Sequence, residues 1–172
     1  MNPEDSTEPY REGPANPDPF SPYEVISTER IYDSAWVGLR RDFLRLDDGA
    51  RQEYHVVEIP DAVCVLPVRT DGRVVLIGQY RYPHGKTHWE CPAGRLEPGE
   101  DPSAGALREL REETGYRAGS LRALPGFYPL NGISDHWVHL FHATDCELEG
   151  ALRLDPSERL IVRDFSPGEA RE

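Results

Sequence analysis

The stretch GRLEPGEDPSAGALRELREETGY, residues 94–116, organises the interpretation of the whole chain. Its second half predicts an α-helix, because Asp101 suits the N-cap, Pro102 the first turn and Gly115 the left-handed C-cap. Its first half is rich in glycine and proline, so we expect a turn-rich approach to that helix. This is the one well-marked helix of the sequence, and strand-rich regions lie on both sides of it.

One face of the predicted helix is strongly acidic. Positions i, i+3 and i+4 share a helix face, and the residues in this relation are Glu109, Glu112 and Glu113. The residues roughly opposite, which we expect to pack on a sheet, are Leu107, Leu110 and Thr114. Three carboxylates within one turn repel one another. The cluster is therefore either a solvated acidic face or a site for a hard divalent cation such as Mg²⁺, which takes oxygen ligands and bridges to substrate phosphates.

The spacing over residues 94–116 follows the pattern G-x5-E-x7-R-E-L-x-E-E-x-G-Y. This pattern resembles the signature of the Nudix hydrolases, G-x5-E-x7-R-E-U-x-E-E-x-G-U, in which U is aliphatic or bulky and apolar. The resemblance extends over Tyr23 to Phe165. It implies an α+β fold, an α/β/α sandwich with a mixed sheet, preceded by an N-terminal antiparallel strand region. It also implies dependence on Mg²⁺ or Mn²⁺ and hydrolysis of a nucleoside diphosphate linked to another moiety.

The resemblance also implies roles for individual residues of this Nudix box. The metal ligands that it implies are the backbone carbonyl of Ala93 and the carboxylates of Glu100, Glu109, Glu112 and Glu113. Glu112 is also a candidate general base, and Glu100 is expected in a supporting or accessory role. Arg108 is expected to orient the carboxylates.

The sequence before the box is similar to the ADP-ribose pyrophosphatase branch of the family, in QYR (79–81) and ECPAG (90–94). Arg81 would hold a phosphate, and the alternative is an ordinary surface position on a strand. Glu90 would contact a ribose hydroxyl or brace the loop. Trp36 would stack on the purine, and the alternative is a tryptophan of the core.

The loop after the box departs from that branch. It reads LNGISDH (130–136), with Asn131 where the branch has a proline and His136 where it has a glutamate. The general base is therefore open between Asp135, Glu112 and Glu158. His136 could itself titrate near pH 7, although a histidine at a strand start is more often structural.

The rest of the chain predicts a single strand-rich domain over residues 23–172, after a flexible, proline-rich and acidic tail over residues 1–22. The strands expected before the helix are 25–32, 36–46, 53–59, 61–69 and 73–82, with DDG (47–49) and TDG (70–72) as turns. The strands expected after it are 120–130 and 137–148, and 159–165 is a strand or a helix. The apolar strands over residues 23–58 suggest a homodimer interface.

The composition limits the classes of partner that this protein is expected to bind. The 172 residues include 19 basic and 31 acidic side chains, so the net charge of −12 disfavours nucleic acid and membrane surfaces as partners. No apolar run reaches the ~18 residues of a membrane span. Three widely spaced cysteines without a C-x-x-C pair favour reduced thiols in a cytoplasm.

The expected reaction is hydrolysis of a nucleoside diphosphate sugar, with ADP-ribose, converted to AMP and ribose 5-phosphate, as the first candidate. Two alternatives remain open at this point. One is a broader nucleotide pyrophosphatase that acts on dinucleotides or modified nucleoside triphosphates. The other is a Nudix-like domain that binds nucleotides for sensing and does not hydrolyse them.

Overall fold

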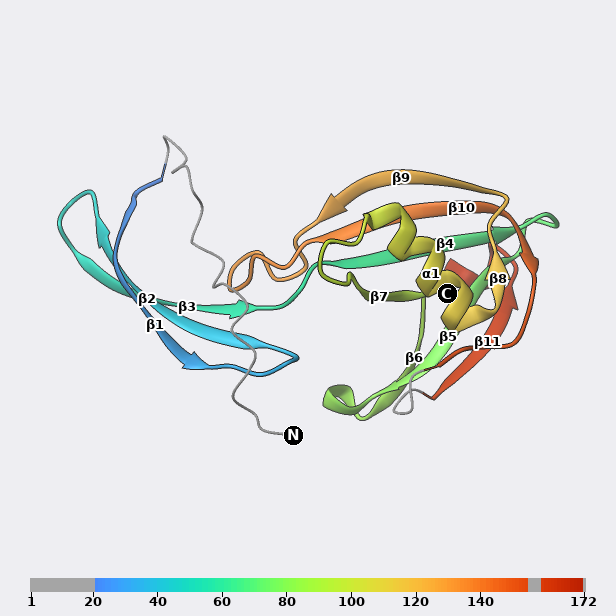
Figure 1. Cartoon of the computed structure of the whole chain (residues 1–172), viewed down its shortest axis with the longest axis horizontal. Coiled ribbons are helices and arrows are strands. Elements are labelled where there is room, and N and C mark those ends of the chain that lie inside the picture. Colours follow the sequence, from blue (N-terminus) through green and yellow to red (C-terminus); the bar gives the residue numbers. More distant parts are fainter. Residues whose placement is uncertain (1–20, 155–158, 172) are drawn as a thin grey trace.

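The computed structural model describes residues 21–154 and 159–171, and the tail expected over residues 1–22 lies almost wholly outside these ranges. The described residues begin with an antiparallel three-stranded sheet of β1 (Tyr23–Tyr32), β2 (Gly38–Leu46) and β3 (Arg51–Glu58). The expected DDG turn joins β2 to β3, and its Gly49 has φ 85°, which favours glycine. Figure 1 shows this N-terminal sheet beside the larger core, with β3 running on into β4.

The core is a mixed sheet with one α-helix. Its elements in chain order are β4 (Ala62–Arg69), β5 (Val74–Arg81), the 3₁₀ turn η1 (Tyr82–His84), β6 (Lys86–Glu90), β7 (Ala93–Arg95), α1 (Pro102–Thr114), β8 (Tyr116–Arg117), β9 (Ser120–Phe127), β10 (Val138–Leu148), β11 (Leu160–Phe165) and η2 (Glu169–Arg171). The strand order is β11-β5-β4-β10-β8, with β10 parallel to β4. The last candidate segment, residues 159–165, is therefore a strand, and the expected α+β class is confirmed.

The pairing of β4 and β5 positions the box. The TDG turn joins them as expected, with the Arg69 N–H donating to the Arg73 carbonyl at 2.8 Å. Next to this turn, Val68 pairs with Val74. Further along, β4 pairs with β7 and β5 pairs with β6. These two short strands carry the chain into the glycine-rich approach to α1.

Helix α1 begins and ends as the sequence predicts. The Asp101 side chain accepts hydrogen bonds from the Ser103 and Ala104 N–H groups at 3.0 and 3.1 Å. Gly115 ends the helix with φ 74°. Leu110 and Thr114 are buried, as expected, but Leu107 is 43% exposed and the prediction for it is wrong. Ala106 takes part in the buried face instead, because that face is rotated slightly towards it.

The core lies between α1 and the sheet. It is formed by Val63, Val65, Val75, Ala106, Leu110, Tyr116, Phe141, Ala143 and Cys146. Full burial of a side chain such as Leu110 contributes roughly 1.5–3 kcal/mol. Within the described ranges α1 is the one α-helix, and it packs against one face of the sheet (Figure 1). None of the helices described is both long and apolar enough to cross a membrane.

Candidate active site

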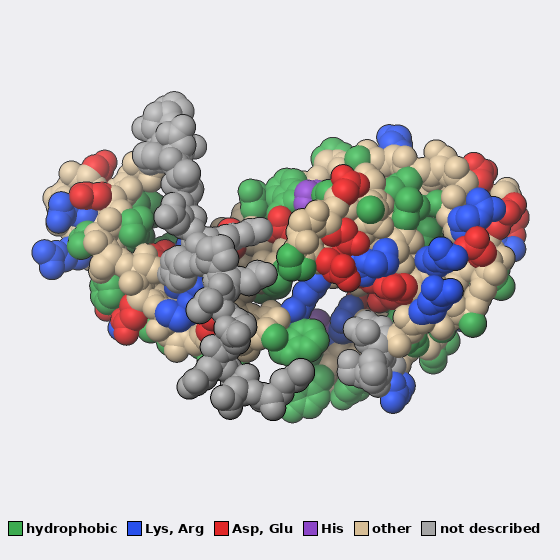
Figure 2. All heavy atoms as spheres, in the orientation of Figure 1, with side chains coloured by type: hydrophobic (Ala, Val, Ile, Leu, Met, Phe, Trp, Pro, Cys, Tyr) green, Lys and Arg blue, Asp and Glu red, His purple; other side chains and the backbone are tan. Residues whose placement is uncertain are grey.

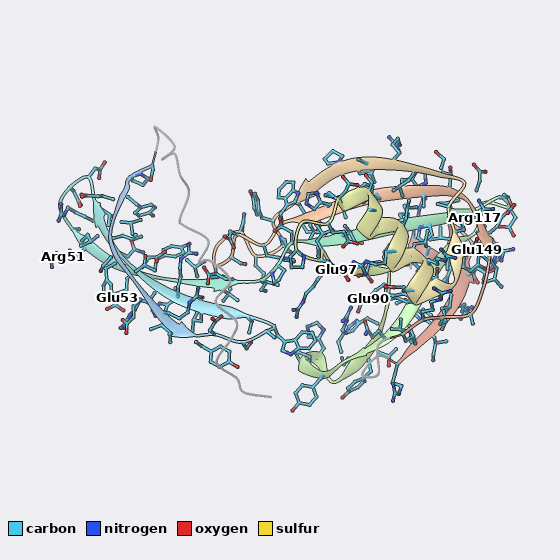
Figure 3. The ribbon with its side chains drawn as sticks, viewed as in Figure 1. Arg51, Glu53, Glu90, Glu97, Arg117 and Glu149 are labelled. Carbon is cyan, nitrogen blue, oxygen red and sulfur yellow. The ribbon has the colours of Figure 1, made fainter. Side chains whose placement is uncertain are left out.

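A cleft of about 1500 Å³ lies between the N-terminal sheet and the core. Its lining comes from the β1–β2 connection (residues 33–37), the approach to the helix (94–100) and the acidic face of α1. Figure 2 shows acidic and basic side chains side by side on this face of the core. In Figure 3, Glu90 and Glu97 lie on the side of the core near the N-terminal sheet, whereas Arg117 and Glu149 lie at its far end.

The cleft has an acidic surplus. Among the lining residues that the structure describes, nine are Asp or Glu and five are Arg. A diphosphate would meet net repulsion on such a surface. A cation that reverses the local charge would therefore strengthen the binding of an anionic substrate here.

Arg108 lies at the centre of the box carboxylates. Its guanidinium donates to both oxygens of Glu100 at 2.8 Å each, to Glu109 at 2.7 Å and to Glu112 at 3.2 Å. It also donates to the main-chain carbonyl of Arg95 at 3.0 Å. The fork of five donors satisfies several carboxylates at once, which a lysine could not do. Arg108 therefore orients the acidic cluster and ties it to the approach segment.

Two further contacts place the remaining box carboxylates. A Cβ at Gly94 would lie under 3.0 Å from three carboxylate atoms of Glu109, so only glycine leaves room for that side chain. Glu113 is 3% exposed, and its carboxylate accepts the Ala93 N–H at 2.8 Å. Glu109 and Glu113 are thus packed against the two residues that precede and begin the box.

Glu100 braces Arg108. Both of its oxygens accept from the Arg108 guanidinium, and the Glu97 N–H donates to the second oxygen at 3.0 Å. The Arg108 hydrogen bonds lower the pKa of Glu100 from 4.5 to about 2. In this arrangement the Glu100 carboxylate holds the guanidinium that in turn holds Glu109 and Glu112.

This pairing predicts a pH-dependent contribution to stability. Because the pKa of Glu100 is lower in the folded state, its contribution is present above the unfolded pKa of 4.5 and is lost as the pH falls towards about 2. We expect Glu100→Gln to lower the Tm at pH 6 and the difference from wild type to shrink between pH 4.5 and 2. Thermal unfolding across this range checks it, with Glu147→Gln as the surface control. A difference independent of pH would contradict the assignment.

The donor set fits a hard divalent cation. The side chains that would hold it are the carboxylates of Glu109, Glu112 and Glu113, and all supply the oxygen atoms that Mg²⁺ and Mn²⁺ prefer. For Ala93, whose carbonyl the resemblance implies as a further ligand, the structure gives the hydrogen bond from its N–H to Glu113. In the described part of the chain, no three Asp, Glu, His or Cys side chains are already gathered at metal-binding distances. Arg108 holds the carboxylates by their oxygens, so cation binding would compete with some of these hydrogen bonds.

Arg81 and Glu90 form a pair across the β5–β6 hairpin. Arg81 donates to the two Glu90 oxygens at 3.0 and 2.6 Å, in a bidentate arrangement. Arg81 lines the cleft. Glu90 therefore aligns the guanidinium plane of Arg81, a contact that differs from both roles considered for it in the sequence analysis.

Trp36 lies in the connection between β1 and β2, outside the strand in which the sequence analysis placed it. It is 67% exposed, so the alternative of a core tryptophan is wrong. Its ring lines the cleft, and the Arg95 guanidinium lies over it at 4.6 Å from the ring centroid.

The loop after the box is attached to the N-terminal sheet. The Val57 N–H donates to the Ile133 carbonyl at 2.7 Å, and the Tyr54 hydroxyl donates to the Gly132 carbonyl. Asp135 lines the cleft. His136 lies with its Nδ1 at 2.8 Å from the Pro60 carbonyl, as expected for a structural histidine, and is absent from the described cleft lining. Glu158, the third candidate base, lies outside the described residues.

Three arginines of the cleft, Arg30, Arg95 and Arg153, were not identified from the sequence. Arg95 follows Gly94 at a variable position of the box pattern. It is the one basic residue between Gly94 and Glu100, and this feature could have marked it as a candidate site residue. Arg153 lines the cleft because its N–H donates to the Glu112 carbonyl at 2.9 Å. No local pattern predicts that contact, since β10 must first return the chain to the end of α1.

The chain is similar to known proteins in sequence and in fold. The NUDIX domain matches residues 58–171. An ADP-ribose pyrophosphatase of Bacillus subtilis (strain 168) is 37% identical over 144 residues, which span 83% of this chain and 78% of that protein. A methanol dehydrogenase activator of Bacillus methanolicus is 36% identical over 148 residues, spanning 86% and 80%. The crystal structure of an ADP compounds hydrolase shares the fold, with a TM-score of 0.77, 22% identity and coverage of 88% of this chain and 82% of that one.

The resemblance seen in residues 94–116 is thus confirmed over most of the chain. The domain match, the relatives and the acidic helix at the cleft lead to one conclusion: this chain belongs to the NUDIX family and is a Nudix hydrolase.

Proposed function

We propose that this enzyme hydrolyses the pyrophosphate bond of ADP-ribose, giving AMP and ribose 5-phosphate, with Mg²⁺ or Mn²⁺ as cofactor. The observation that carries the proposal is that one cleft is lined by the box carboxylates, by Arg81 and by an exposed tryptophan, Trp36. Carboxylates suit a cation, a guanidinium suits a phosphate, and an aromatic ring suits a nucleobase. The name of the B. subtilis relative supports the same substrate.

The chemistry follows from these side chains. A pyrophosphate bridge reacts slowly because its anionic oxygens repel a nucleophile. A divalent cation held by Glu109, Glu112 and Glu113 would neutralise that charge and make water more acidic. We assign the role of proton acceptor to Glu112 or Asp135, which both line the cleft.

Arg81 and Trp36 would orient the substrate. The Arg81 guanidinium, aligned by Glu90, would donate to a phosphate of the diphosphate bridge and stabilise the charge that develops there. Trp36 would stack on the base. This division of roles predicts that any nucleoside diphosphate sugar shares the Arg81 contact, whereas the base and the second sugar determine selectivity.

A substrate panel tests the proposal. The purified protein is incubated with ADP-ribose, other nucleoside diphosphate sugars, dinucleotides and modified nucleoside triphosphates, each with Mg²⁺, Mn²⁺ or EDTA. Chromatography then resolves the products. We expect the highest kcat/KM for ADP-ribose, AMP among the products and no turnover in EDTA.

The panel also separates the alternatives. A higher kcat/KM for dinucleotides or nucleoside triphosphates would favour the broader nucleotide pyrophosphatase. Nucleotide binding without turnover of any substrate would favour a sensing domain. The box retains all of its carboxylates, and Arg108 binds three of them, Glu100, Glu109 and Glu112, which supports hydrolysis over sensing.

We also propose that the enzyme is a homodimer that uses the N-terminal sheet. Every residue of β1 is exposed, and the strand presents large apolar side chains, which include Val25 (58%) and Tyr32 (55%). Such a strand at a sheet edge is prone to pair with another chain unless a partner covers it. A second copy of this chain would bury it.

Light scattering checks the assembly. We expect the mass of two chains at micromolar concentration, and a single-chain mass when Val25 and Ile31 of β1 are both replaced by Glu, because the buried charges would be unpaired. Leu148→Glu serves as the control, since Leu148 is 67% exposed but lies on β10. A wild-type monomer at micromolar concentration would refute the proposal.

A further inference from the structure

Arg95 links the Nudix box to the β1–β2 connection, because its main chain and its side chain make separate contacts. Its main-chain carbonyl accepts a hydrogen bond from Arg108 at 3.0 Å, and its backbone pairs with Ala62 of β4. Its side chain extends to the β1–β2 connection, where the guanidinium lies 4.6 Å from the centre of the Trp36 ring. One of its nitrogens also donates to the Ala35 carbonyl at 3.4 Å. The Arg95 backbone is therefore bonded to the box, whereas the Arg95 side chain contacts Trp36.

Hydrogen bonds within the β1–β2 connection hold the backbone around Trp36, but they do not hold its indole ring. The Ser34 hydroxyl accepts from the Trp36 and Val37 N–H groups at 3.2 and 3.1 Å, which is a turn built by one side chain. Trp36 as a whole residue is 67% exposed. A planar guanidinium lying over it restricts its rotamers, as an ammonium group could not do equally well.

We infer that Arg95 is a positioning residue that holds Trp36 in the orientation in which its ring accepts a nucleobase. The inference rests on the base-stacking role of Trp36 in the proposed function. Because Arg95 covers one face of the ring, the base takes the opposite face. The guanidinium, the indole ring and the base then form one stack at the rim of the cleft, on the side of the N-terminal sheet.

This arrangement predicts a change in KM without an equal change in kcat. A substitution of the Arg95 side chain leaves its carbonyl in place, so Arg108 and the carboxylates keep their geometry. Loss of the cation–π contact removes preorganisation of the base site, which corresponds to about a three- to thirtyfold weakening of binding.

The variants are Arg95→Met, which keeps the length but removes the guanidinium, and Arg95→Lys, which restores the charge alone. The matched control is Arg163→Met, because Arg163 lies over the Phe165 ring at 4.7 Å on β11 and is absent from the described cleft lining. Trp36→Phe, alone and combined with Arg95→Met, completes a double-mutant cycle.

Two readouts are used: steady-state kinetics with ADP-ribose and Mg²⁺, and quenching of tryptophan fluorescence by ADP-ribose in EDTA. Trp36→Phe identifies the part of the quenching due to Trp36. We expect Arg95→Met to raise both KM and the fluorescence Kd about three- to thirtyfold, with kcat within about twofold of wild type. For Arg95→Lys, KM and Kd should lie between those of wild type and Arg95→Met, and for Arg163→Met they should equal those of wild type. The KM of the double variant should be little above that of Trp36→Phe alone.

Unchanged KM and Kd in Arg95→Met, additive losses in the double variant, or no Trp36 quenching by ADP-ribose in the wild type would each overturn the inference. A wild type that binds ADP-ribose with Trp36 quenching but does not hydrolyse it would refute the proposed function instead. In that case the fluorescence Kd of Arg95→Met still decides the inference.

Discussion

Replacement of Glu113 by glutamine is expected to lower kcat by about 10²–10⁴-fold while the domain remains folded, because a divalent cation supplies several kcal/mol of transition-state stabilisation. Glu113 is 3% exposed, and one of its oxygens accepts the Ala93 N–H. A glutamine oxygen can accept the same bond, so the loop before the helix keeps its attachment. What the variant loses is the negative charge that a cation requires. Kinetics at saturating Mg²⁺, with thermal unfolding alongside, measures the two effects separately.

The control is Glu147→Gln, since Glu147 pairs with Arg117 at an exposed edge of the core. It should retain wild-type kcat. Near wild-type turnover of Glu113→Gln at saturating Mg²⁺ would show that Glu113 is not a ligand. Because the structure buries Glu113, glutamine, which keeps the shape of the side chain, is the informative replacement.

Replacement of Gly94 by alanine should have the next largest effect. The new Cβ would overlap the Glu109 carboxylate, which must then leave its position beside Arg108. A shift of about 1 Å in a catalytic group can cost roughly 10²-fold in rate, so we expect a loss in kcat of this size or more. Steady-state kinetics measures it, and a Mg²⁺ titration should show weaker activation.

Gly150→Ala is the matched control for this change. A Cβ at Gly150 meets no atom within 4 Å, so the same substitution adds the same methyl group without a clash. If Gly94→Ala retained full activity, Glu109 would not depend on the close approach that the structure shows. A similar loss in both variants would indicate a general effect of removing glycine.

The local structure of the box followed from the sequence. The limits of α1 depend on Asp101 and Gly115, whose hydrogen bonds reach only residues within the same few turns. The DDG and TDG turns depend on glycines with positive φ, again a property of three or four neighbouring residues. The spacing of the glutamates on one helix face follows from 3.6 residues per turn. These features therefore depend on interactions between neighbouring residues and not on contacts with distant parts of the chain.

Which side chains of the site come into contact is determined only by the tertiary structure. Trp36 and Arg95 are separated by 59 positions, and their contact depends on how the N-terminal sheet lies beside β7. His136 is directed to Pro60, and Asp135 to the cleft, because the loop after the box attaches to β3. The exposure of Leu107 depends on the rotation of α1 against the sheet. Such contacts arise from strand register and packing between segments far apart in the chain, whereas helical periodicity and turn chemistry act only between neighbours.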